Sequence, residues 1–320
     1  MESMENIKDK NVLVTGGTGF VGSHLVEALV KKGANVFVPY RSIDLRSYFY
    51  TEKLNTKVIL PSCDIKDKDR VFDIVSKYKI IYIFHLAAQA IVPTAYENPV
   101  ETIESNIMGT TYILEAARRF PHVKAVLVAS SDKSYGKSAK PYVETDPLKG
   151  DHPYDVSKAS TDLIAQAYAK TYHLPIVITR FGNIYGEGDL NFSRIIPGIM
   201  KAIITKEKLI LRSDGTYVRD YVYVKDVISG YLFLLQQIDK AKGGAFNLSS
   251  DNSYSVVDLI KQVEKIFKRK IRYSIENSAK NEIPYQHLNA TKIYKLGWKP
   301  TFSLKATLPS ILRWYKTILK

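Results

Sequence analysis

A tyrosine and a lysine four residues apart are the first groups in this sequence that could do chemistry. Tyr154 and Lys158 stand at the two ends of YDVSK, and on a helix this spacing places both side chains on one face. A lysine ammonium beside a phenol favours the phenolate, so we expect Lys158 to lower the pKa of Tyr154. Such a phenol suits a general acid/base that acts on an alcohol or sugar hydroxyl.

A second polar group follows a short apolar run. Residues 124–130 (KAVLVAS) predict a strand, and this strand leads into Ser131, Asp132 and Lys133. Strand ends that face the ligand crevice are where doubly wound sheets carry out chemistry. Desolvation can keep a carboxyl such as Asp132 protonated, which makes it an acid. For Lys133 three interpretations stay open: it removes a proton, it stabilises an anion, or it merely pairs with Asp132.

A glycine-rich turn near the N-terminus predicts a dinucleotide cofactor. TGGTGFVG places Gly16, Gly19 and Gly22 after a predicted strand, and Phe20 and Val21 begin a predicted helix. In a dinucleotide-binding turn one glycine permits the bend, the next admits the pyrophosphate to backbone amides, and the third lets helix and strand pack. The helix N-terminus then faces the phosphates.

The residues after the second predicted strand leave the choice of cofactor open. Arg41 can pair with a 2′-phosphate and so favours NADP, whereas Asp44 could accept the ribose hydroxyls of NAD. Asp64 follows the third predicted strand. It either meets the edge of the adenine or caps the start of the helix near Asp67.

These residues need a scaffold in which strands and helices alternate. Apolar runs predict strands at 10–15, 34–39, 57–61, 80–86, 124–130 and 175–179, and helical periodicity predicts helices at 67–78, 99–119 and 153–172. This alternation is typical of an α/β fold with a Rossmann-like, doubly wound parallel sheet. The rhythm loosens after Arg180. We therefore expect a dinucleotide-binding domain over 1–180, to which a helix at 224–239 returns, a smaller substrate domain over 181–320, and a C-terminal helix at 304–318.

Composition excludes several classes of protein. The 320 residues are 45% hydrophobic and 24% charged, as in an ordinary folded chain, and no apolar run reaches the ~18 residues of a membrane span. The single cysteine, Cys63, favours a cytoplasmic location. Subtracting 32 acidic from 46 basic residues gives a net charge of +14. No arginine-rich block accompanies this charge, so we expect anionic small ligands such as dinucleotides and nucleotide sugars, not a nucleic acid or a membrane.

Eight ordered motifs resemble the extended short-chain dehydrogenases/reductases that modify nucleotide sugars, the NAD-dependent epimerase/dehydratase family. They are TGGTGFVGSH, HLAAQA, SNIMGT, SSDKSYG, YDVSK, RFGNIYG, RDYVYVKDV and LGWKP. The resemblance implies a Rossmann-like domain with NADP or NAD tightly bound and recycled. It also implies a C-terminal domain that binds a nucleoside diphosphate sugar, and a homodimer formed through the helices near 97–119 and 153–172.

The resemblance also implies roles for individual residues. Tyr154 would be the catalytic base and acid, Lys158 would bind the nicotinamide ribose, and Ser131 would hydrogen-bond the sugar 4-hydroxyl. Further cofactor contacts are implied at Ile65, Leu86, Ala87 and Ala88, and substrate contacts at Gln89, Asn183, Arg194, Arg212 and Arg219. For Arg194 and Arg212 a solvated surface charge is the alternative. We assign His85 no metal-binding or catalytic role, and no metal site is expected.

The Asp132-Lys133 pair resembles the CDP-glucose 4,6-dehydratase branch of the family, as does GNIYGEGDLNFSRIIP at 182–197. Asn289 departs from the aspartate that many relatives carry there. The branch implies that hydride leaves C4, water is lost across C5 and C6, and hydride returns to C6. The alternatives are a 4-epimerase or C4 dehydrogenase, which needs only the oxidation, and a non-catalytic cofactor-binding scaffold or RNA-binding protein.

Overall fold

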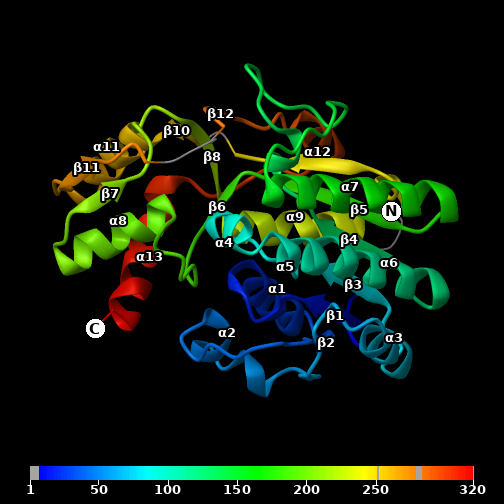
Figure 1. The fold of residues 1–320 in the computed structure, drawn as a ribbon. Coiled ribbons are helices and arrows are strands. Elements are labelled where there is room, and N and C mark those ends of the chain that lie inside the picture. The colour runs from blue at the N-terminus through cyan, green and yellow to red at the C-terminus, as the bar shows by residue number, and fades with distance from the viewer. Residues whose placement is uncertain (1–6, 251, 279–282, 320) are drawn as a thin grey trace.

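A six-stranded parallel sheet forms the centre of the larger part of the molecule. In the computed structural model, which describes residues 7–250, 252–278 and 283–319, the strand order is β2-β1-β3-β4-β5-β9 (Figure 1). The strands are β2 (Asn35–Phe37), β1 (Asn11–Thr15), β3 (Tyr82–His85), β4 (Ala125–Ala129), β5 (Ile176–Phe181) and β9 (Ala245–Leu248). The order reverses between β1 and β3, so a crevice for ligands is expected at the carboxyl ends of these two strands.

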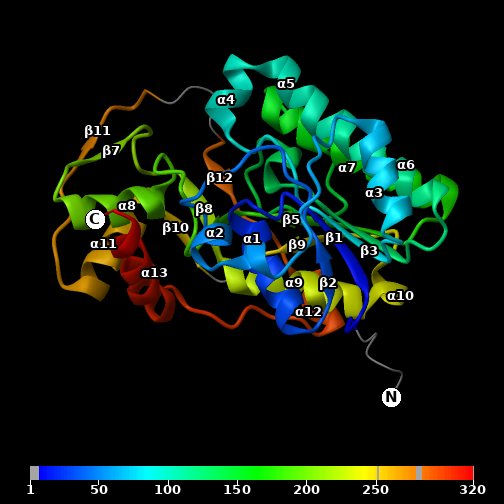
Figure 2. The same cartoon turned by 90° about the horizontal axis from the view of Figure 1, so that it is seen from below.

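Helices cover both faces of this sheet, because its strands are apolar on both sides (Figure 2). The helices packed on one face are α3 (Lys68–Lys77), α6 (Gly109–Arg119) and α7 (Pro153–Tyr172). Those on the other face are α1 (Phe20–Lys31), α9 (Val224–Gln236) and α12 (Thr291–Leu296), with α10 (Ile238–Ala241) beside them. The predicted α/β doubly wound fold is confirmed.

Two predicted elements differ from those observed. Residues 57–61 form one isolated bridge, from Ile59 to Phe37 of β2, and Ser62 forms a second with Tyr40. The continuous strand predicted at 57–61 is therefore wrong. A short α2 (Tyr48–Thr51) and a single 3₁₀ turn, η1 (Leu54–Thr56), precede this segment. The helix predicted at 99–119 is three pieces in succession: α5 (Pro99–Ile103), the π-helical turn η2 (Glu104–Met108) and α6. Its N-terminal neighbour is α4 (Val92–Glu97).

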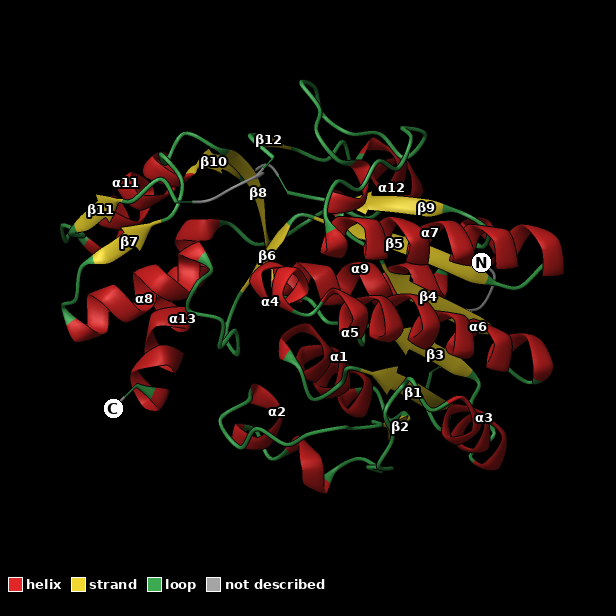
Figure 3. Cartoon of the chain, viewed as in Figure 1, coloured by secondary structure: helices red, strands yellow, loops and turns green. Residues whose placement is uncertain are grey.

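A smaller sheet and a separate apolar core form the other part of the molecule (Figure 3). Its central strand β8 (Val218–Tyr223) pairs with β6 (Asn183–Tyr185), β10 (Ser253–Ser255) and β12 (Tyr285–Gln286), while β7 (Leu209–Leu211) pairs with β11 (Tyr273–Ile275). The helices that pack here are α8 (Ile195–Thr205), α11 (Val256–Phe267) and α13 (Leu304–Ile318). The predicted bounds of the C-terminal helix match α13.

The chain passes between the two parts more than once. After β8 it returns as α9, which ends at Gln236, three residues before the predicted end, and then as β9, which pairs in parallel with β5. The division of labour between residues 1–180 and 181–320 stays a prediction. None of the helices in the described part of the chain combines the length and apolar character of a membrane span.

Candidate active site

The glycine turn between β1 and α1 leaves room for a ligand to approach the backbone. Gly16 has φ +70°, and a Cβ there would lie 2.7 Å from the backbone nitrogen of Ala87. A Cβ at Gly22 would lie 2.1 Å from the carbonyl oxygen of Gly16, so only glycine allows α1 to pack this close to the turn. Gly19 is the N-cap of α1 and has no side chain to cap it, which keeps first-turn N–H groups available to a phosphate. The turn therefore fits a dinucleotide.

The predicted ribose-reading arginine is engaged by carboxylates. Arg41 donates to Glu101 Oε1 at 2.6 Å and lies 3.8 Å from Asp64 Oδ2. Lys66 joins the same cluster, 3.0 Å from Glu101. Asp64 accepts from the backbone of Lys66, whereas the N-cap of α3 is Asp67, so the cap proposed for Asp64 lies three residues further on. Neighbouring Ile65 packs at Gly109.

A cavity of about 1110 Å³ opens at the carboxyl ends of the central strands and extends to the smaller sheet. Many of the predicted site residues line it: Phe20, Val21, Leu86, Ala88, Ser131, Asp132, Lys133, Tyr154, Lys158, Asn183, Arg194, Arg212 and Arg219. Gln89 is not among the described residues that line it. Both ends of the Gln89 amide instead bind the backbone of Ile91, at 2.9 and 2.6 Å.

The turn η3 (Asp132–Tyr135) carries the acidic group of the site. Ser131 is its N-cap and donates to Asp132 Oδ1 at 3.1 Å. Gln286 of β12 donates to Asp132 Oδ2 at 3.2 Å, and its own oxygen lies 3.4 Å from Lys133 Nζ. Burial raises the pKa of Asp132, and the charge of Lys133 offsets part of this rise. The raised pKa makes Asp132 easier to protonate than an exposed aspartate.

Tyr154 and Lys158 lie on α7, which packs against η3. Burial raises the pKa of Tyr154 to about 12, while a hydrogen bond with Ser131 lowers it in part. The expectation that Lys158 lowers this pKa is therefore wrong for this structure. Lys158 donates to the carbonyl oxygen of Ala129, and burial lowers the pKa of its own ammonium to about 8. Desolvation of the phenol is thus the main influence on the pKa of Tyr154.

The histidine at the end of β3 has structural partners in the core. His85 lies between Thr15 and Thr110, with its ring nitrogens 2.7 and 2.9 Å from their hydroxyls, and burial lowers its pKa to about 3. Through these two contacts the neutral side chain of His85, on β3, connects β3 to β1 and to α6. Within the described ranges no cluster of three or more histidine, cysteine or carboxylate side chains is placed to hold a metal.

The arginines on the substrate side differ in their surroundings. Arg219, on β8, is buried, donates to the carbonyl oxygen of Pro284 at 3.3 Å and lies over the ring of Tyr217. Arg194, at the N-cap of α8, pairs with buried Asp189 at 3.1 Å. Arg212 is exposed and bonds only weakly to the chain, at 3.4 Å from the Ser193 carbonyl oxygen. All three border the cavity together with Asn183.

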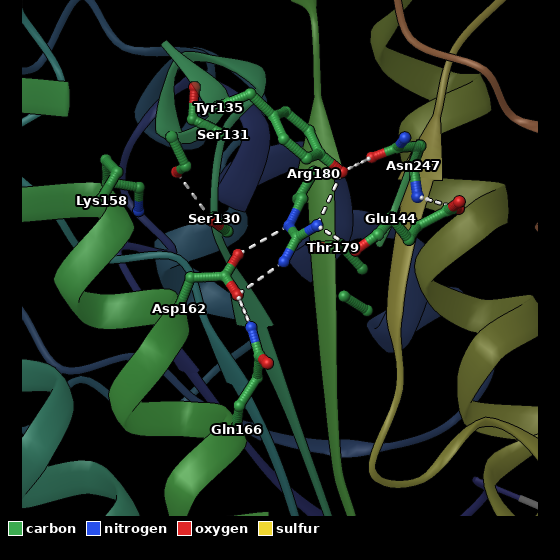
Figure 4. Close-up of polar contacts among 12 residues, drawn as sticks. Ser130, Ser131, Tyr135, Glu144, Lys158, Asp162, Gln166, Thr179, Arg180 and Asn247 are labelled. Atoms are coloured by element: carbon green, nitrogen blue, oxygen red, sulfur yellow. Dashed lines mark hydrogen bonds and ion pairs between the residues drawn. The ribbon is translucent and has the colours of Figure 1, made fainter. Parts of the chain in front are cut away.

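A buried ion pair underlies η3 (Figure 4). Arg180 of β5 forms two hydrogen bonds with Asp162 of α7, at 2.8 and 2.9 Å, and donates to the hydroxyl of Tyr135 at 2.6 Å. Tyr135 in turn donates to Asn247 of β9 at 2.7 Å. Gln166 donates to Asp162 at 2.7 Å. The network connects η3, which bears Asp132, to strands β5 and β9 of the main sheet and to helix α7 packed on it.

Sequence reasoning missed three residues of the site. Gln286 reaches Asp132 from a strand 154 positions later, with no motif to announce it. His152 and Asp155 flank the Tyr154 motif. His152 lines the cavity, and Asp155 lies beneath it, with His152 Nε2 3.1 Å from Asp155 Oδ2. Both residues lie close to Tyr154 in the sequence, which could have marked them as candidates. Their positions in the sequence do not show that the side chains of His152 and Asp155 lie in contact.

Comparison with known proteins identifies the class of enzyme. The model of the NAD dependent epimerase/dehydratase family matches residues 12–249. The CDP-glucose 4,6-dehydratase of Salmonella typhimurium is 29% identical, over 97% of this chain and 92% of its own. The fold, the glycine turn and the cavity thus define an NAD-dependent enzyme of the nucleotide-sugar dehydratase/epimerase class. The chain belongs to the NAD dependent epimerase/dehydratase family, as its motifs predicted.

Solved structures support both branches of this class. The UDP-glucuronic acid 4-epimerase of Bacillus cereus, in complex with UDP-glucuronic acid and NAD, has a TM-score of 0.88 at 26% identity, covering 96% of this chain and 99% of its own. A dTDP-glucose 4,6-dehydratase of Streptomyces venezuelae, with NAD bound, has a TM-score of 0.86 at 26% identity, covering 96% and 97%. Overall likeness does not separate dehydratase from epimerase, so the choice depends on the site.

Proposed function

We propose that this enzyme is a nucleotide-sugar 4,6-dehydratase acting on a substrate like CDP-glucose. The observation that carries the proposal is Asp132, a carboxyl whose pKa is raised by burial and which lines the same cavity as Tyr154 and Lys133. Elimination of water needs an acid to protonate the departing O6 hydroxyl, whereas a 4-epimerase or C4 dehydrogenase has no such step.

The roles of the other residues follow from their positions. Tyr154 accepts the proton of the sugar 4-hydroxyl, and Ser131, which hydrogen-bonds with it, orients that hydroxyl. Lys133 places a positive charge beside Asp132, where it stabilises negative charge that develops on the sugar. Arg219, which is buried, and Arg194 both border the cavity, and we assign them to the diphosphate. The bound nicotinamide would take hydride from C4 and return it to C6.

A panel of CDP-, GDP-, UDP- and dTDP-glucose, analysed by mass spectrometry after incubation with the NAD-supplemented enzyme, tests the function directly. A product lighter by one water is expected with one member of the panel. A product of unchanged mass but altered configuration at C4 would identify an epimerase. Oxidation that needs added NAD in stoichiometric amount would identify a C4 dehydrogenase.

We also propose NAD as the cofactor. Arg41 is neutralised by Glu101 and Asp64, so a 2′-phosphate would have to displace or confront carboxylates. We expect calorimetric titration to give tighter binding for NAD than for NADP, and cofactor extracted from denatured enzyme to be NAD. Replacing Glu101 with Gln should reduce the difference in affinity between NAD and NADP, because Arg41 then becomes available to the 2′-phosphate of NADP. Mostly NADP in the extract would show instead that Arg41 reads the 2′-phosphate.

Replacing Asp132 with Asn is expected to separate oxidation from elimination. The amide cannot donate an acidic proton to O6, but Tyr154 remains to assist oxidation at C4. After addition of substrate, absorbance of the reduced nicotinamide should accumulate while loss of water falls by about 10²-fold or more. Product formation at the wild-type rate would remove Asp132 from the mechanism and favour the epimerase or dehydrogenase alternatives.

We propose that the enzyme is a homodimer formed through α5, η2, α6 and α7. Large apolar side chains lie exposed on these helices, among them Val100 at 67% and Leu163 at 54% exposure. On α7, Val156 and Leu163 are seven residues apart and share one face. Exposed apolar side chains grouped in this way mark protein contacts.

Replacing Leu163 with Glu should therefore convert a dimer into a monomer, because a carboxylate would be buried at the contact. Light scattering coupled to size-exclusion chromatography measures the change. Leu45 is a matched control, since it is even more exposed but lies in the loop before α2. Replacing Leu45 with Glu should leave the dimer intact. A monomeric wild type, or a dimeric Leu163→Glu variant, would contradict this interface.

A further inference from the structure

A histidine and an aspartate beside the catalytic tyrosine have no role in the mechanism so far. His152 is the N-cap of α7, lines the cavity, and has a side chain that is only 9% exposed. Within the described part of the chain, no hydrogen-bond partner reaches its Nδ1 atom. A buried nitrogen left without a partner is costly, and in a cavity it indicates an atom that a ligand satisfies.

The surroundings of His152 fix its ring. The backbone carbonyl oxygen of His152 accepts the N–H of Val156 in the first turn of α7, and the ring packs against Tyr96 of α4 with 5.1 Å between ring centroids. On the other side Asp155, fully buried, approaches Nε2 to 3.1 Å. The two groups lie at ion-pair distance but are not aligned as a hydrogen bond. With the ring proton on Nε2, toward Asp155, Nδ1 carries the lone pair.

Charged groups of the site surround this pair. Lys133 acts electrostatically on both His152 and Asp155, and Asp132 and Asp151 act on Asp155. Burial lowers the pKa of His152 and raises the pKa of Asp155 to about 7. His152 is thus neutral and able to accept a proton, whereas a lysine ammonium such as that of Lys133 has donors and no lone pair. A dehydratase needs a base as well as an acid.

We propose that His152, supported by Asp155, is the base that removes the C5 proton of the sugar, which leaves Lys133 to stabilise the resulting enolate electrostatically. This role rests on the proposed dehydratase function. His152 would touch the reacting atoms and is a catalytic residue in this scheme. Asp155 acts through His152 and is a positioning residue.

The proton transfers balance in the following order. The C5 proton passes to His152 Nδ1, and the electron pair of the C5–H bond forms the enolate of the 4-ketone. The enolate then collapses to a C5–C6 double bond, the bond from C6 to O6 breaks, and O6 leaves as water with the proton of Asp132. When hydride has returned to C6, the imidazolium of His152 gives a proton back to C5. The imidazolium exchanges its proton with solvent before this return, so in heavy water C5 receives a deuteron.

Replacing His152 with Asn tests the role with the panel sugar that the wild type turns over. We expect the variant to accumulate reduced nicotinamide, to lose dehydration by about 10²-fold or more, and to incorporate no deuterium at C5. Asp132→Asn should still exchange the C5 proton, since the base acts before the acid. Replacing His173, exposed at the far end of α7, with Asn is the matched control and should leave turnover unchanged.

Three measurements keep the outcome decisive. Melting temperature and NAD content establish that His152→Asn is folded. Asp155→Asn retains the imidazole, so its dehydration rate should fall less than that of His152→Asn. The wild-type dehydration rate should rise between pH 6 and 8, about one unit on either side of the raised pKa of Asp155, and this rise should be smaller in Asp155→Asn. Normal C5 exchange by His152→Asn, in an enzyme that dehydrates, would overturn this role alone. A wild type that loses no water from any panel sugar would overturn the dehydratase function as well.

Discussion

Replacing Tyr154 with Phe is expected to lower turnover by about 10²- to 10⁴-fold, because it removes the group that we propose exchanges a proton with the sugar 4-hydroxyl. The ring is buried, so phenylalanine keeps the packing and the fold. Both oxidation at C4 and everything that follows it should slow together. Stopped-flow absorbance of the reduced nicotinamide measures the first step directly.

The pH dependence gives this prediction a second readout. Burial raises the pKa of Tyr154 to about 12, so at neutral pH the phenol is protonated and its basic form grows as the pH rises. The wild-type rate of C4 oxidation should therefore increase with pH, and the residual rate of Tyr154→Phe should not. Tyr168, on the same helix but hydrogen-bonded to Glu115, is the control, and Tyr168→Phe should retain wild-type turnover. Near-normal oxidation by Tyr154→Phe would exclude the proposed role.

The largest expected effect on stability comes from the ion pair beneath the site. Arg180 and Asp162 are almost fully buried and joined by two hydrogen bonds. Replacing Arg180 with Met leaves the Asp162 carboxylate buried without its partner, which should cost about 3–5 kcal/mol of unfolding free energy. Denaturation by urea, followed by circular dichroism, measures the loss.

Two further variants distinguish the cost of leaving the Asp162 carboxylate buried and unpaired from the cost of losing an ion pair as such. Adding Asp162→Leu to Arg180→Met should recover much of the stability, because an apolar pair of similar volume needs no charge compensation. The exposed pair of Lys261 and Asp258 has a similar separation of 3.1 Å, and Lys261→Met should change stability by less than about 1 kcal/mol. If Arg180→Met unfolds at the wild-type urea concentration, the ion pair does not hold the turn that carries Asp132.

Much of the fold could be predicted because its signals are local. The apolar runs that became β1, β3, β4 and β5 are continuous, since both faces of the sheet are covered. The segment at 57–61 carries the same kind of run. It lies beyond β2 at the edge of the sheet, where one neighbour supplies all the pairing and only isolated bridges form. The π-helical turn inside the helix at 99–119 leaves no mark in the apolar periodicity.

The site was less predictable, because it depends on burial and on distant parts of the chain. Motifs located Tyr154, Lys158 and Asp132, but spacing on a helix could not tell that burial raises the pKa of Tyr154. Arg41 was interpreted as a phosphate ligand, since its partner Glu101 lies 60 residues away. Gln286 joins the site only through the pairing of β12 with β8, which no local pattern reveals.

The return of the chain to the first sheet limits how such an enzyme can diverge. Strand β9 comes from residues 245–248 yet pairs with β5, and α9 covers the same sheet. A chain cut after residue 180 would expose the edge of β5 and the apolar face beneath α9, which invites aggregation. Residues 181–320, which we propose bind the substrate, therefore do not form a separable module. We expect new specificities to arise instead by point substitution and loop variation around the shared cavity.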